Sequence, residues 1–129
     1  MIVDTSAIVA IWLREPGWEA LCQKLEADPA PAMSAAGLVE LYAVIDSRTS
    51  PENQRRLDTL LSAFGIVVEP FTHEQADVAR AAYHDYGKGS GHPARLNMGD
   101  CFAYALASVT HQPLLFVGDD FTHTDLIAA

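Results

Sequence analysis

The 129-residue sequence has few basic residues. Only 8 Lys and Arg stand against 17 Asp and Glu, which gives a formal net charge of −9 at pH 7. Electrostatic binding to DNA or to anionic lipid needs clustered Lys and Arg, so this balance excludes broad, nonspecific coating of either one. Any contact with a polyanion must therefore be confined to a local site.

Cysteine and long apolar runs are also scarce. Cys22 and Cys101 lie far apart with no CxxC spacing, which favours a reducing compartment and argues against a zinc knuckle. No apolar run reaches the roughly 18 residues that a membrane-spanning helix needs. Asp4 interrupts the first apolar stretch and no basic segment precedes it, so a secretory signal is not expected. We therefore expect a cytoplasmic protein with no membrane partner.

Apolar residues are plentiful. They make up 50% of the chain while charged residues make up 19%, which excludes a disordered acidic polymer. Internal repeats, low-complexity tracts and linker-like shifts in composition are absent from the sequence. The whole chain, residues 1–129, is therefore expected to form a single domain with a sizeable core.

Short apolar runs alternate with segments of helical periodicity. Helix-start signals are Pro16, Ser34, Ser50-Pro51, a Thr72-x-x-Gln75 capping box and Asn97. Residues 87–93, rich in glycine, are expected to be flexible. Strands are predicted at 1–3, 32–33, 66–68 and 114–117, with a final edge strand within 125–129. This alternation predicts an α/β fold whose parallel sheet is covered on both faces.

Acidic residues follow two of these strands. Asp4 comes directly after the first strand, and Asp119 and Asp120 come after the strand at 114–117. The functional crevice of a parallel sheet lies beyond the carboxyl ends of its strands, so these acids are expected at one edge.

Two further acids lie on predicted helices. Asp100 falls in the first turn of its helix, where the helix dipole favours negative charge. Glu40 lies among apolar residues, so it must either face solvent or be paired. Each acid also has a simpler interpretation: a helix cap for Asp4, a dipole partner for Asp100, an exposed side chain for Glu40 and a turn for Asp119-Asp120. If they converge, their repulsion would be relieved by a hard cation such as Mg²⁺ or Mn²⁺.

Four motifs together resemble a known family. The start, Met-Ile-Val-Asp-Thr-Ser-Ala, and Glu40-Leu41-Tyr42 resemble PIN-domain proteins. Residues 96–104, Leu-Asn-Met-Gly-Asp-Cys-Phe-Ala-Tyr, resemble the VapC toxins of bacterial type II toxin–antitoxin modules. Residues 114–121, with Thr124-Asp125 just after, are similar to the closing motif of those toxins. The resemblance covers the whole chain in order.

That resemblance implies both a fold and an activity. The fold is a PIN-like three-layer α/β/α sandwich with a short central parallel sheet. The activity is that of a Mg²⁺-dependent endoribonuclease toxin, in which Mn²⁺ can substitute for Mg²⁺. The resemblance also implies neutralisation by a VapB-type antitoxin and formation of a homodimer.

The resemblance also implies a set of site residues. Asp4, Glu40 and Asp100 match the family's acids as catalytic residues and metal ligands. The fourth acid falls in the pair after residue 118, where Asp120 is preferred because it precedes Phe, and Asp119 stays open.

Hydroxyl and basic residues surround these acids. Thr5 and Ser6 either support Asp4 and its metal site or cap the helix. Lys88, His92 and Arg95 lie in or beside the glycine-rich segment, and they either contact RNA phosphates or belong to a solvated loop. This segment is not a P-loop, because Lys88 precedes the glycines.

Two alternatives remain. The apolar run at 8–13, with Trp18, either forms an antitoxin groove or dimer surface, or it packs in the core. A phosphoacceptor receiver-like signalling domain has similar size and class, but it needs adjacent acids after its first strand and a late Lys. Here Thr5 follows Asp4, and no Lys occurs after Lys88. Labelling by acetyl phosphate would support the receiver.

Overall fold

The protein is built around a four-stranded parallel sheet. The computed structural model describes residues 1–48 and 50–129. The strand order is β3-β2-β1-β4, and Ile2 of β1 lies opposite Ala32 on one side and Leu114 on the other. The strands are β1 (Ile2–Val3), β2 (Ala32–Ser34), β3 (Val67–Glu69) and β4 (Leu114–Leu115).

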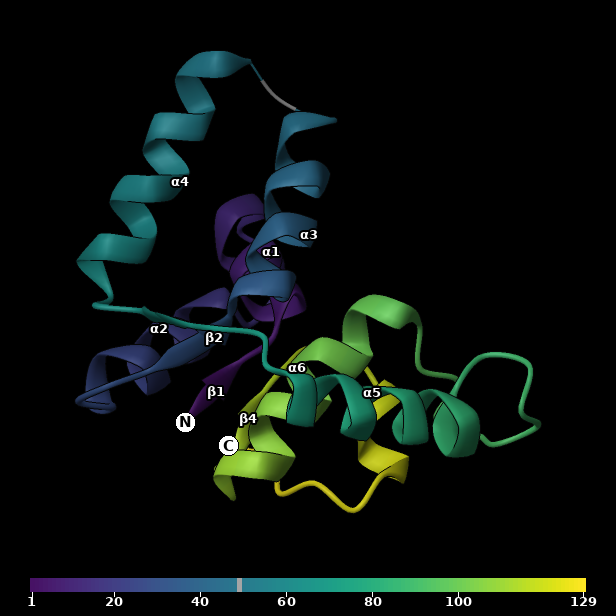
Figure 1. The fold of residues 1–129 in the computed structure, drawn as a ribbon. Coiled ribbons are helices and arrows are strands. Elements are labelled where there is room, and N and C mark those ends of the chain that lie inside the picture. Colours follow the sequence, from purple (N-terminus) through teal and green to yellow (C-terminus); the bar gives the residue numbers. More distant parts are fainter. Residues whose placement is uncertain (49) are drawn as a thin grey trace.

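Helices cover both faces of this sheet (Figure 1). Successive strand residues point to opposite faces, so Val3 joins one apolar cluster and Ile2 the other. The first cluster packs against α1 (Thr5–Leu13), α2 (Trp18–Ala27), α3 (Ala35–Asp46) and α4 (Pro51–Ala63). The second packs against α5 (His73–Tyr86) and α6 (Met98–Thr110). The three-layer α/β/α sandwich predicted from the sequence is confirmed.

Several predicted boundaries are wrong. The strand expected at 114–117 pairs only at Leu114–Leu115, because Phe116 leaves the ladder and packs on Phe121 with ring centroids 5.1 Å apart. The final edge strand is reduced to a single bridge between Leu114 and Ala128. Pro16 lies outside α2, which begins at Trp18 after Gly17 in a left-handed conformation.

The predicted capping box before α5 is half formed. The Thr72 hydroxyl accepts a hydrogen bond from the Gln75 N–H at 3.2 Å, as the pattern predicts. The Gln75 side-chain amide instead donates to the Pro70 carbonyl at 3.1 Å. This contact ties the end of β3 to α5, which a purely local motif does not reveal.

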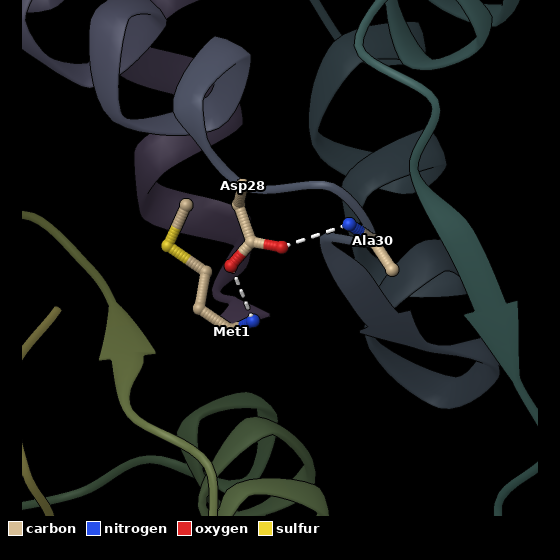
Figure 2. A network of polar contacts seen from close by, with 3 residues as sticks. All are labelled: Met1, Asp28 and Ala30. Atoms are coloured by element: carbon tan, nitrogen blue, oxygen red, sulfur yellow. Dashed lines mark hydrogen bonds and ion pairs between the residues drawn. The ribbon is translucent and has the colours of Figure 1, made fainter.

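An ion pair fixes the start of β1 (Figure 2). The α-ammonium group of Met1 donates to Oδ2 of Asp28 at 2.7 Å, and Asp28 Oδ1 accepts from the Ala30 N–H at 2.9 Å. The hydrogen bond from the Met1 ammonium group is the main cause that lowers the pKa of the Asp28 carboxyl below its usual value, and the bond from the Ala30 N–H adds to it. These two contacts join Met1, which lies three residues before Asp4, to the loop that precedes β2.

In the described residues no helix is long and apolar enough to cross a membrane.

Candidate active site

Asp4 lies at the carboxyl end of β1 and caps α1. Its side chain is buried, with 4% of the residue exposed. The Ser6 N–H donates to Asp4 Oδ2 at 2.9 Å, and the Ser6 hydroxyl donates to the same oxygen at 2.6 Å. The N–H of Val117 in turn donates to the Ser6 hydroxyl oxygen at 3.0 Å. Ser6 therefore links the Asp4 carboxylate to the segment that follows β4.

Asp100 is held by a reciprocal cap at the start of α6. The Asn97 side-chain oxygen accepts from the Asp100 N–H at 2.9 Å, while Asp100 Oδ2 accepts from the Asn97 N–H at 2.8 Å. These two bonds fix the orientation of the carboxylate and satisfy two N–H groups of the helix end. The sequence identified Asn97 as a cap but did not reveal its hold on Asp100.

Glu40 reaches the same place from α3. A Cβ atom built on Gly99 would lie 1.4 Å from Glu40 Oε2. The Glu40 carboxylate therefore rests directly over the backbone of Gly99, one residue before Asp100. Only glycine leaves room for this close approach. Gly99 is a candidate site residue that the local sequence pattern does not reveal, because its contact is with a side chain about 60 positions away in the chain.

Thr5 supports this side of the cluster. Its hydroxyl donates to the Gly37 carbonyl at 3.3 Å, which joins the start of α1 to α3. Burial, followed by the charge of Asp4, raises the pKa of Glu40, and the nearby Thr5 hydroxyl opposes that rise. Thr5 thus lies between the two carboxylates that the sequence placed in the site.

The acids act on one another electrostatically. Burial is the largest cause that raises the pKa of Asp4, and the charge of Asp120 adds to it. Burial also raises the pKa of Asp100 to about 7, with contributions from Asp4, Asp120 and Glu40 and an opposing hydrogen bond from Asn97. In the part of the chain that the structure describes, none of the four carboxylates forms an ion pair with Lys or Arg.

Asp119 and Asp120 differ in their surroundings. Asp120 begins the 3₁₀ turn Asp120–His123, and its charge acts on both Asp4 and Asp100. Asp119 precedes that turn, and its backbone carbonyl accepts from the Thr122 hydroxyl at 2.6 Å. The geometry therefore favours Asp120 as the fourth acid of the cluster.

The donor set suits a hard divalent cation. Carboxylate oxygens are the ligands that Mg²⁺ prefers, and Mg²⁺ usually keeps several of its waters. Across residues 1–48 and 50–129, no three His, Cys, Asp or Glu side chains are placed to share one ion directly. The four acids repel one another and, within the described residues, none pairs with Lys or Arg, so they would suit a hydrated ion held partly through its water molecules.

The basic residues of the glycine-rich segment separate into two groups. Lys88 and Arg95 line a cleft of about 230 Å³ together with Asn97 and Asp120. His92 is not among the residues that line it. Its ring packs edge-on against Tyr86 with centroids 4.9 Å apart, and its Nδ1 accepts from the N–H of Ala94 at 3.2 Å.

Comparison with known proteins agrees with this architecture. The family model of the PIN domain matches residues 1–126. The solved structure of VapC20 from Mycobacterium tuberculosis, described as a sarcin–ricin loop cleaving toxin, superimposes with a TM-score of 0.74 at 14% identity, covering 99% of this chain and 97% of that one. VapBC2 from Rickettsia felis, solved bound to a DNA fragment from its promoter, gives a TM-score of 0.73 at 21% identity and covers 99% and 96%.

Sequence similarity narrows the assignment. The chain is 58% identical over 126 residues to Ribonuclease VapC42 of Mycobacterium tuberculosis, covering 98% of this chain and 96% of the relative. The chain therefore belongs to the PIN-domain family, and within it to the VapC ribonucleases. The receiver-like alternative finds no support in these comparisons.

Proposed function

We propose that this protein is a Mg²⁺-dependent endoribonuclease, the toxin of a toxin–antitoxin module. The observation that carries the proposal is the convergence of Asp4, Glu40, Asp100 and Asp120 from four separate segments. Their charges act on one another, and no basic side chain of the described residues neutralises them. When these carboxylates are ionised, a bound cation would relieve their repulsion.

The residues have distinct roles in this proposal. Asp4 and Asp100 hold the ion, while Glu40 and Asp120 act as ligands directly or through water. Ser6 donates to Oδ2 of Asp4 and Asn97 donates to Oδ2 of Asp100, and neither contact occupies Oδ1. Ser6 and Asn97 keep the two carboxylates in place before an ion arrives, which lowers the cost of ordering them.

A divalent ion supplies what phosphodiester hydrolysis needs, namely a lowered pKa of water and stabilisation of charge at phosphorus. Mn²⁺ has the same preference for oxygen ligands and is expected to substitute. The protein's residues contribute positioning: Asp4 caps α1, Asp100 lies in the first turn of α6, and the Glu40 carboxylate lies against Gly99.

The proposal includes two protein partners, a VapB-type antitoxin and a second copy of the chain. Support for the antitoxin comes from a further solved structure of the same fold, described as a toxin–antitoxin complex from Klebsiella pneumoniae, with a TM-score of 0.73. The apolar run at 8–13 is largely core: Ile8 and Ile11 are buried, and only Leu13 is exposed, at 42%. Trp12 and Trp18 are half-buried. Sedimentation of the purified chain at micromolar concentration tests the dimer, and a monomer would contradict it.

Expression of the chain in bacteria tests the activity. We expect growth arrest and new RNA ends at defined positions when the chain is expressed alone. Asp100→Asn is the matched control, because the amide oxygen still accepts from the Asn97 N–H and preserves the cap. A pattern of RNA ends that is the same for both proteins would contradict the proposal.

A further inference from the structure

We propose that Lys88 and Arg95 bind backbone phosphates of single-stranded RNA beside the scissile bond, an inference that rests on the proposed nuclease function. Both residues line the same cleft as Asn97 and Asp120. Asp120 belongs to the acid cluster, and Asn97 holds Asp100. The cleft, here called the loop cleft, therefore adjoins the proposed metal site.

The segment that carries these cations is closed at its base. The Lys88 N–H donates to the Leu96 carbonyl at 2.8 Å, and the Leu96 N–H donates to the Tyr86 carbonyl at 2.9 Å. This pairing brings Lys88 and Arg95 to the same end of the segment, directly before the cap of α6. The segment predicted to be flexible is thus anchored where its two cations lie.

The backbone of Arg95 supports a role for its side chain. Arg95 adopts a φ of +51°, in the left-handed region. Arg14 and His111 share that conformation, but each ends a helix, where it is common. Arg95 instead follows the turn at 93–94, and glycine would adopt the conformation without cost. The Arg95 side chain lines a cleft beside the acid cluster, and this placement supports a role for it there.

Charge complementarity identifies the occupant. Neither Lys88 nor Arg95 forms an ion pair within the described residues, although the chain carries a net charge of −9. A guanidinium fork and an ammonium group suit phosphate oxygens. Because the acid cluster itself repels RNA, two unpaired cations at its edge supply the attraction that the site lacks.

The test measures RNA binding apart from cleavage. Every variant is made in the Asp100→Asn background, with Mg²⁺ present and a fluorescent single-stranded RNA as the probe. Gel analysis of the same samples shows whether the RNA stays intact. Continued cleavage in that background would count against the proposed function, whereas unchanged binding in the cleft variants would count against this inference.

Lys88→Met and Arg95→Gln should each weaken binding roughly three- to tenfold. Each should also reduce the slope of log K against log salt by about 0.7, the value for one phosphate contact on a single strand. Arg95→Lys should keep the salt slope, since it keeps the charge. Arg56→Gln is the matched control, because Arg56 is exposed on α4, at the opposite end of the molecule from the loop (Figure 1).

Arg95→Gly separates binding from folding. Glycine relieves the left-handed backbone, so this variant should weaken RNA binding without lowering Tm. The proposal would be overturned if the Lys88→Met/Arg95→Gln double variant had the same RNA affinity and the same salt slope as Arg56→Gln. A carboxylate-bearing protein would then be the better candidate for the cleft.

Discussion

Replacing Asp100 by Asn should stabilise the metal-free protein while abolishing its activity. Burial and the charges of three other acids raise the pKa of the Asp100 carboxyl from 3.8 to about 7. The ionised form is therefore disfavoured in the folded state. The amide of Asn removes that charge and still offers an oxygen to the Asn97 N–H.

The size of the effect depends on pH. Below pH 4 the Asp100 carboxyl is protonated in both the folded and unfolded states, so the two proteins should have similar free energies of unfolding. Between pH 4 and about pH 7 the unfolded state loses the proton first, and the wild type loses stability as the pH rises. Above pH 7 the full penalty applies.

A rise in pKa of this extent corresponds to about 4 kcal/mol at most, at 1.36 kcal/mol for each tenfold change. Asp100 is partly exposed, and solvent screening reduces this to about 2 kcal/mol. The helix dipole stabilises the ionised carboxylate, which reduces the expected loss of stability further, to about 1 to 2 kcal/mol. Asp100→Asn should therefore be more stable by that amount at pH 8.

Urea unfolding in EDTA at pH 4 and pH 8 measures the difference between the two proteins. Other titrating groups are common to both and largely cancel. Added Mg²⁺ should stabilise the wild type more than Asp100→Asn. A variant that is less stable than the wild type at pH 8 in EDTA would refute the reasoning.

Two further variants test the geometry of the site. Gly99→Ala should keep or slightly raise Tm, because alanine favours a helix, yet reduce RNA cleavage more than tenfold by displacing Glu40. Gly37→Ala is the control, since its Cβ would make ordinary contacts at 3.8 Å; equal cleavage by both variants would exclude this role for glycine. Ser6→Ala should lose about 1 to 2 kcal/mol in urea unfolding and need more Mg²⁺ for cleavage, because Asp4 loses its 2.6 Å bond. An unchanged Mg²⁺ requirement would show that Ser6 does not position the carboxylate.

Much of the site follows from rules about parallel sheets. Asp4 and Asp120 follow strands β1 and β4, and the parallel arrangement brings them to the same edge. Asp100 is also predictable in position, since Asn97 marks the start of α6. The layered arrangement is also predictable from the sequence, because short apolar strands alternate with helices along the chain.

Tertiary contacts account for what the sequence left open. The pattern around Glu40 permits either an exposed or a paired side chain. In the structure the side chain is half-buried, and its carboxylate lies against Gly99. The four-residue strand expected at 114–117 is shortened because Phe116 finds an aromatic partner outside the sheet. The packing of the His92 ring on Tyr86 is also not visible in the local sequence. Each outcome depends on residues distant in the chain or on loop closure.

Cleavage of a defined single-stranded RNA by the purified chain, titrated with Mg²⁺, tests the central claim most directly. Cleavage should be absent in EDTA and should rise as Mg²⁺ is added. It should also occur when Mn²⁺ is supplied in place of Mg²⁺. Asp4→Asn, which keeps an acceptor for Ser6, should stay inactive at every Mg²⁺ concentration that saturates the wild type. Cleavage that persists in EDTA, or equal cleavage by Asp4→Asn, would contradict a metal-dependent nuclease built on these four acids.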